Sequence, residues 1–154
     1  MRKIVLITAI LVSLIAPASA ADQKDVTLVV GMIANKKVPV ISREGNQIVF
    51  VHKGMRYTFW DSGERTKADE PNSAWLSVWV RKDGTSGQET MDTFSDHGFD
   101  GVVDFGIDGP KKKIFRSGVD GSSAKEGFEH QAFWQERYDA AIRAGVEYLR
   151  SHSR

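Results

Sequence analysis

Residues 47–60 read QIVFVHKGMRYTFW, two β-prone runs on either side of Lys53-Gly54. A two-residue turn at Lys53-Gly54 pairs His52 with Met55, and the pairing continues outward until Gln47 meets Trp60. One face of this hairpin then carries five apolar side chains: Ile48, Phe50, Met55, Tyr57 and Phe59. An antiparallel hairpin with one apolar face is typical of a sheet that covers a core.

Further strands are expected on both sides of this hairpin. Residues 61–73 form a polar loop, and the run from Ala74 to Val80 then alternates so that both of its faces are apolar. Pro39 cannot donate to a sheet, so the extended run around it is an edge strand or an irregular segment. Strands are also predicted at residues 26–33, 90–94, 102–107 and 113–115.

The C-terminal segment changes to a helical period. Ser123 and Glu126 fit a capping box, and apolar residues then recur every three or four positions as far as Leu149. We therefore expect one long amphipathic helix over residues 124–151. The predicted fold is α+β: an antiparallel sheet of about five to seven strands, built from hairpins, with this helix packed on it.

Composition excludes several classes of protein. Of the 154 residues, 41% are hydrophobic and 27% are charged, as in ordinary soluble domains. The chain has no cysteine, which rules out a disulfide scaffold, a thiol nucleophile, a Cys-ligated zinc site and an iron–sulfur cluster. The formal charge of +1 argues against a nucleic-acid partner, because such binders usually carry a large basic excess.

The first twenty residues have the order of a cleavable secretory signal. Arg2 and Lys3 precede an apolar run from Ile4 to Ala16, and small residues then lead to an A-x-A site that ends at Ala20. The run is too short to span a hydrocarbon core of about 30 Å. We expect cleavage after Ala20, a periplasmic or secreted location, and a single globular α+β domain over residues 21–154 that does not span the membrane.

An acidic segment includes the predicted strands at 90–94 and 102–107. Residues 89–109 contain six Asp or Glu and no Lys or Arg. Within it, residues 96–104 read DHGFDGVVD and resemble an EF-hand or dockerin-type calcium loop over nine residues. The resemblance implies that Asp96, Asp100 and Asp104 would bind Ca²⁺ as a cofactor, together with the Val102 carbonyl.

The acidic segment also departs from that calcium loop. Gly98 stands where an acid or amide is usual, and Ile107 stands where the family has a bidentate acid. No helical pattern flanks the loop. The alternative interpretation is the tip of a β-hairpin in which aspartate and glycine supply the turn geometry without a metal.

Three tryptophans suggest a binding face. Trp75 and Trp79 alternate with apolar residues on one strand, and Trp60 ends the neighbouring strand. If the helix covers only the opposite face of the sheet, these rings are accessible and can stack on sugars or peptides. The alternative is that a second layer buries them in a core.

No catalytic motif occurs in the chain. Glu126 and His130 lie four residues apart on the predicted helix and could act with a loop aspartate, although such pairs are ordinary features of helix surfaces. The leading expectation is therefore a non-catalytic binding or accessory protein whose partner is a protein or polysaccharide of the cell envelope. The alternatives are an envelope hydrolase that uses Glu126 and His130, and a structural or inhibitor protein that uses the tryptophan face.

Overall fold

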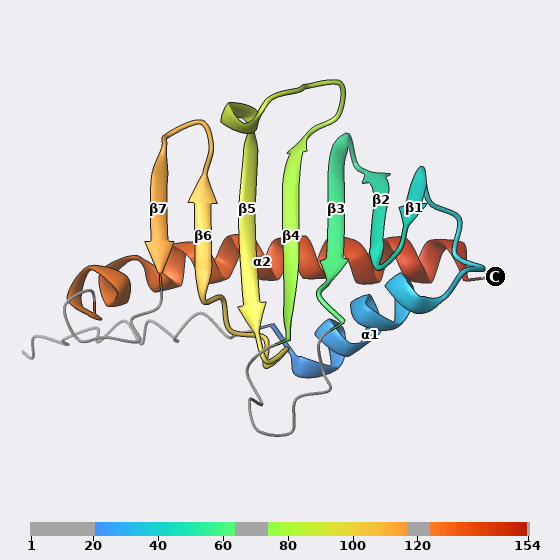
Figure 1. Ribbon diagram of the computed structural model, residues 1–154, viewed down its shortest axis with the longest axis horizontal. Coiled ribbons are helices and arrows are strands. Elements are labelled where there is room, and N and C mark those ends of the chain that lie inside the picture. Colours follow the sequence, from blue (N-terminus) through green and yellow to red (C-terminus); the bar gives the residue numbers. More distant parts are fainter. Residues whose placement is uncertain (1–20, 64–73, 117–123, 154) are drawn as a thin grey trace, which may run out of the picture.

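The computed structural model describes residues 21–63, 74–116 and 124–153. Seven antiparallel strands form one sheet whose order follows the sequence, and two helices pack on it (Figure 1). This confirms the predicted α+β class and adds an N-terminal helix. The elements are α1 (Gln23–Ala34), β1 (Ser42–Glu44), β2 (Gln47–His52), β3 (Met55–Asp61), β4 (Trp75–Lys82), a 3₁₀ helix (Gln88–Thr90), β5 (Met91–His97), β6 (Phe105–Asp108), β7 (Lys113–Arg116) and α2 (Ala124–His152).

The β2–β3 hairpin has the register predicted from the sequence. His52 pairs with Met55 at the turn, and Gln47 pairs with Trp60 at the open end. Lys53 and Gly54 both have positive φ angles, 50° and 75°. Two positive φ angles are those of a type I′ turn, whose twist matches the right-handed twist of the paired strands.

The core lies between the sheet and the helices. One position from each of β2 to β7 forms a row across the helix-covered face: Ile48, Phe59, Val78, Phe94, Gly106 and Phe115. The five side chains in this row are buried, and α2 crosses the strands behind them (Figure 1). At Gly106 an added Cβ would lie 2.5 Å from the Trp134 ring of α2, so only glycine lets the helix come this close.

Residues 26–33 belong to α1, so the strand predicted there is wrong. Asp22 caps the helix by accepting a hydrogen bond from the Lys24 N–H at 3.0 Å. An added Cβ at Gly145 of α2 would lie 2.6 Å from Phe59 and 2.9 Å from a methyl of Val29, so both helices and the sheet meet there. The residues buried on α1 are three or four apart, which is the helical period: Val26, Val29, Met32 and Ile33.

The segment between α1 and the sheet is irregular, as the proline in it suggested. The Arg43 guanidinium of β1 donates to the carbonyls of Ile33, Asn35 and Val38, with the last two at 3.0 and 3.4 Å. It thereby satisfies carbonyls at the C-terminal end of α1 that have no partner within the helix. Among the described residues, neither helix has a stretch long and apolar enough to cross a membrane.

Candidate binding surface on the uncovered sheet face

Among the described residues, no helix or strand covers the sheet face opposite α1 and α2. Val78, on the helix-covered face of β4, is buried, whereas Trp75, Trp79 and Arg81 on the other face of the same strand are half-buried. In Figure 1 the helix α2 passes behind the strands, so the uncovered face is turned toward the reader. Its central row runs from β2 to β7 and contains Val49, Thr58, Trp79, Thr93, Ile107 and Ile114.

All three tryptophans of the predicted binding face lie on this surface and are half-buried. Trp60 and Trp75 contact each other edge to face, with ring centroids 5.8 Å apart. The Trp75 ring lies at the same centroid distance from His97. Trp79 is four residues from Trp75 on the same strand, which corresponds to about 13 Å because a strand rises about 3.3 Å per residue.

A shallow hollow of about 200 Å³ opens beside Trp79. Strands β2 to β5 each contribute to its wall, so the hollow depends on the register of four strands. Its lining combines one aromatic ring with polar and cationic side chains: Gln47, Arg56, Thr58, Trp79, Arg81 and Met91. Drug-sized ligands usually occupy pockets of about 300–1,000 Å³. This hollow therefore suits one ring or one charged group of a larger molecule.

Two arginines face each other in this hollow. Arg56 and Arg81 are directly paired on β3 and β4, and like charges in that position destabilise a sheet. Arg56 Nε lies 3.0 Å from Asp83 Oδ1, which neutralises one of the two charges. Arg81 makes no ion pair with any residue that the structure describes. As far as the described residues go, the hollow therefore carries one uncompensated positive charge next to the Trp79 indole.

The β5–β6 loop, residues 98–104, is held by Asp96, which is buried at the end of β5. Asp96 Oδ1 accepts the Asp100 N–H at 3.2 Å, and Oδ2 accepts the Gly101 N–H at 3.1 Å. The Tyr138 hydroxyl of α2 also donates to Oδ2, at 2.7 Å. Burial raises the pKa of Asp96 to about 6, and the hydrogen bonds from Tyr138 and the loop limit that rise.

The three loop aspartates do not fit a calcium site in this arrangement. Asp100 Oδ1 accepts the Val102 N–H at 2.8 Å, and Asp104 Oδ2 accepts the His97 N–H at 2.7 Å. Calcium requires six to eight oxygens that converge on one point. No three acidic or histidine side chains among the described residues are grouped to hold a metal ion. The carboxylates instead cap turns, as in the hairpin-tip alternative.

A second cluster, which sequence reasoning missed, lies between the sheet and α2. Arg137 Nη1 binds Asp108 Oδ2 at 2.9 Å, and Nη2 binds Asp92 Oδ2. Asp92 and Asp108 are directly paired on β5 and β6. Burial, opposed by Arg137, raises the pKa of Asp92. The pKa of Asp108 is lowered. Burial acts to raise it, but the hydrogen bonds from the Lys111 N–H and from Arg137 outweigh the effect of burial. One arginine thus compensates two carboxylates.

This cluster borders a cavity of about 160 Å³ under α2. Apolar and aromatic groups make up the rest of the lining: Tyr57, Val80, Phe94, Ala140 and Ala141. Asp92 Oδ1 is buried and accepts no hydrogen bond from any residue in the described part of the chain. Because both aspartates are bound to Arg137, we interpret the cluster as an ion network that joins the sheet to the helix.

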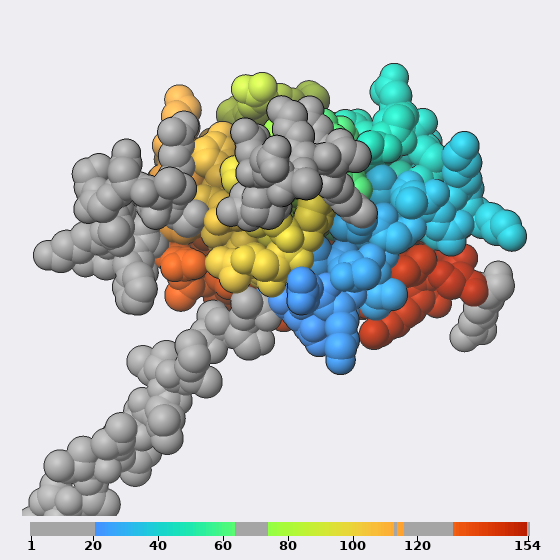
Figure 2. All heavy atoms as spheres, turned by 60° about the horizontal axis from the view of Figure 1, so that its bottom comes forward, coloured from blue at the N-terminus to red at the C-terminus, as the bar shows by residue number. Residues whose placement is uncertain are grey.

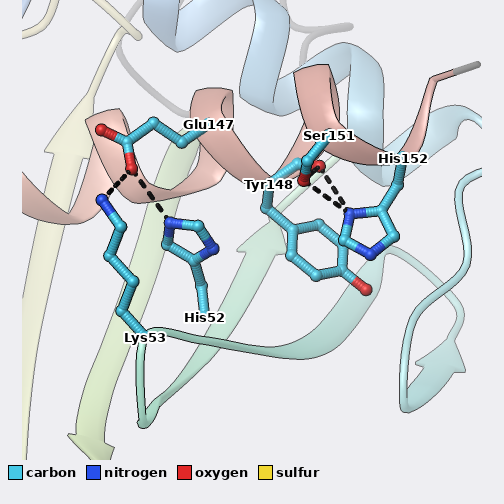
Figure 3. Close-up of polar contacts among 6 residues, drawn as sticks. All are labelled: His52, Lys53, Glu147, Tyr148, Ser151 and His152. Carbon is cyan, nitrogen blue, oxygen red and sulfur yellow. Dashed lines mark hydrogen bonds and ion pairs between the residues drawn. The ribbon is translucent and has the colours of Figure 1, made fainter.

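Histidine and carboxylate also meet near the C-terminal end of α2 (Figure 3). Glu147 Oε2 accepts hydrogen bonds from Lys53 Nζ at 2.6 Å and from His52 Nε2 at 3.0 Å. The bonds from Lys53 and His52 lower the pKa of Glu147 to about 2. They connect the tip of the β2–β3 hairpin to α2.

Ser151 and His152 complete the group in Figure 3. Ser151 Oγ lies 2.8 Å from His152 Nδ1, a spacing also found between a nucleophile and its base. Both groups, however, are directed at the Tyr148 carbonyl oxygen, at 2.8 and 2.9 Å respectively. They therefore satisfy a carbonyl at the end of the helix, which is a capping function.

Glu126 and His130 belong to α2, but their side chains lie outside the part of the structure that is described. Asp96, a loop aspartate that such a site would need, is buried and bound as above. The capping box at Ser123 also begins outside the described residues.

Comparisons with protein families, with curated proteins and with solved structures give no match to this chain. The class of protein is therefore defined by the fold: a seven-stranded antiparallel meander with two helices on one face and an aromatic, cationic surface on the other.

Proposed function

We propose that this chain is an exported, non-catalytic binding protein of the periplasm or cell exterior. Its ligand is an anionic polysaccharide of the cell envelope, which lies on the uncovered sheet face. The observation that carries the proposal is the accessible Trp79 ring beside the opposed pair Arg56 and Arg81. The order of residues in the first twenty positions supports export and cleavage after Ala20.

The chemistry of the hollow favours an acidic sugar over a neutral one. The face of an indole stacks on apolar ring faces. A guanidinium binds a carboxylate through two parallel hydrogen bonds, and Arg81 has no competing acidic partner among the described residues. Asp83 neutralises Arg56 but not Arg81, so an anion that binds Arg81 relieves the like-charge cost that remains in this pair.

The layout of the face favours a polymer over a single sugar. The hollow beside Trp79 is open and small, and a second aromatic group, Trp60 with Trp75, lies on the same face. Because Trp75 and Trp79 are about 13 Å apart along the strand, a ligand must be extended to contact both. Several weak contacts along a chain then add up to useful affinity.

The test is binding of the protein to an acidic polysaccharide, polygalacturonate, and to neutral dextran, followed by tryptophan fluorescence and calorimetry. We expect binding to polygalacturonate that weakens with salt, and none to dextran. The variants Trp79→Ala and Arg81→Gln should each weaken binding about tenfold, which corresponds to about 1.4 kcal/mol.

The matched control is Ile114→Ala on the same face, because Ile114 is 66% exposed and lies outside the hollow. This variant should bind like the parent protein. Equal binding to both polysaccharides, or unchanged affinity in Trp79→Ala, would overturn the proposal. Binding of an envelope protein on the same face, without affinity for the polysaccharide, would also overturn the choice of ligand.

A further inference from the structure

Ala21, the first residue after the predicted cleavage point, lies in a defined socket. Its backbone N–H donates a hydrogen bond to the Asp139 carboxylate of α2. Its carbonyl oxygen lies against Gly101, where an added Cβ would overlap it, and the residue packs on the core. Figures 1 and 2 both show the start of α1, in blue, beside the loop between β5 and β6, in yellow.

The socket is polar, buried and internally connected. Gln135 and Asp139 are 4% and 5% exposed. Gln135 Nε2 donates to the Gly101 carbonyl at 2.8 Å and to Asp139 Oδ1 at 2.7 Å, and Gln135 Oε1 accepts the Val103 N–H at 3.0 Å. One amide therefore joins the β5–β6 loop to the carboxylate that Ala21 contacts.

Asp139 has no ion-pair partner among the described residues. Burial raises the pKa of Asp139, while its hydrogen bonds from Gln135 and Ala21 lower it. Arg143 attracts this carboxylate from a distance, and Glu136 repels it. A buried carboxylate is costly unless a positive charge contacts it. The uncleaved chain offers only a neutral peptide N–H at that point.

We propose that cleavage after Ala20 completes this site, because the new α-ammonium group of Ala21 then forms an ion pair with Asp139. The inference rests on the export part of the proposed function and is independent of the ligand. Hydrolysis adds one water across the Ala20–Ala21 bond, so Ala20 leaves with a carboxylate. The nitrogen of Ala21 becomes an amine and takes up a proton at neutral pH.

The ion pair joins the mature N-terminus, α2 and the β5–β6 loop. The dipole of α1 opposes a positive charge at this end of the helix, whereas the carboxylates of Asp22 at the N-cap and Asp25 in the first turn favour one. The buried contact with Asp139 adds to the stabilisation of the positive charge by these carboxylates. Processing then stabilises the folded state directly, and the mature protein is more stable than its precursor.

The experiment begins with the full chain expressed in an exporting bacterial host, with the N-terminus of the product determined by intact mass. Two further chains, released from a tag by proteolysis, begin at Ala20 and at Ala21, each with and without Asp139→Asn. We expect the Ala21 chain to have an unfolding equilibrium constant about tenfold lower than the Ala20 chain. Asp139→Asn should abolish that difference.

A second measurement keeps the proposal testable if Asp139→Asn does not fold. NMR titration of the α-amine should give a pKa above the usual 7.7–8.0 in the Ala21 chain and an ordinary pKa in the Ala20 chain. An ordinary pKa in both, with equal stability, would overturn the ion pair and leave export intact. A mature N-terminus other than Ala21 would overturn the ion pair together with the predicted cleavage site.

Discussion

The Tyr138 hydroxyl of α2 donates a 2.7 Å hydrogen bond to Asp96 Oδ2 at the end of β5. Both groups are buried, and the same carboxylate accepts two N–H groups of the β5–β6 loop. Burial, followed by the Asp96 charge, raises the pKa of Tyr138 well above its usual value, so its hydroxyl remains protonated and donates. This contact connects α2, the sheet and the loop through one acidic side chain.

The variant Asp96→Asn should lower the free energy of unfolding at pH 7 by about 1–3 kcal/mol. An asparagine has one acceptor oxygen, so its NH₂ group must face a backbone N–H that Asp96 now satisfies. The control is Asp100→Asn, which keeps a carbonyl oxygen to accept the Val102 N–H and should change stability by less than about 0.5 kcal/mol. Urea unfolding measures the stability of both variants. Equal effects would contradict the conclusion that Asp96 joins the loop to α2.

The parent protein should become less stable as pH rises from about 4 to 6. The pKa of Asp96 is about 6 in the folded state and about 3.8 when unfolded, so the folded state holds the extra proton in this window. The contribution is greatest below pH 3.8 and is lost above pH 6. Asp96→Asn should remove this part of the pH dependence, as followed by urea unfolding at pH 4 and pH 7.

Calcium at millimolar concentration should leave the melting temperature unchanged. The oxygens of Asp96, Asp100 and Asp104 accept N–H groups of their own loop and do not converge. A ligand that binds only the folded state must raise the melting temperature, so calorimetry with and without calcium is decisive. A rise that Asp104→Asn abolishes would show that the loop rearranges to bind the ion.

Arg137→Met should destabilise the protein by about 2–4 kcal/mol at pH 7, because it leaves two opposed, partly buried carboxylates without their cation. Adding Asp92→Asn should recover part of the loss by removing one of those charges. Arg150→Met, an exposed position near the end of the same helix, is the control and should change stability by less than about 0.5 kcal/mol. Equal destabilisation by Arg137→Met and Arg150→Met would contradict a specific ion network.

Two glycine substitutions should have opposite signs. Gly106→Ala should destabilise by about 1–3 kcal/mol, since its Cβ would meet the Trp134 ring. Gly31→Ala lies in α1 with no atom within 4 Å of the new Cβ, and alanine should stabilise the helix by about 0.5–1 kcal/mol. Thermal melting of both variants measures the difference, and equal effects would contradict the close approach of α2 to β6.

The β2–β3 hairpin could be predicted to the residue because alternation and a two-residue turn are local signals. The strand predicted at residues 26–33 failed because valine and isoleucine have high strand propensity, while the spacing of Val26, Val29 and Met32 followed the helix period. Burial against α2 and the sheet outweighed that propensity, and no local pattern reports such a partner.

The candidate surface was partly predictable. Alternation on β4 placed Trp75 and Trp79 on one face, but the opposition of Arg56 and Arg81 depends on a β3–β4 register set across a long loop. The pairing of Asp92 with Arg137 joins residues 45 positions apart, and the contact of Ala21 with Asp139 spans nearly the whole chain. One signal in the sequence pointed to the Asp92–Arg137 pair, the acidic segment that contains Asp92, and none pointed to the contact of Ala21 with Asp139.

The sequential order of the strands has a consequence for how the chain acquires its structure. Every strand pairs with the segment made immediately before it, so most of the sheet forms through short loop closures of low contact order. Most of the covering layer on its apolar face arrives after the sheet, because α2 follows all seven strands in the chain whereas only α1 precedes them. Until then most of the row that contains Phe59, Val78 and Phe94 faces solvent, and a chain that stops before α2 has a complete set of strands but a hydrophobic face prone to aggregation.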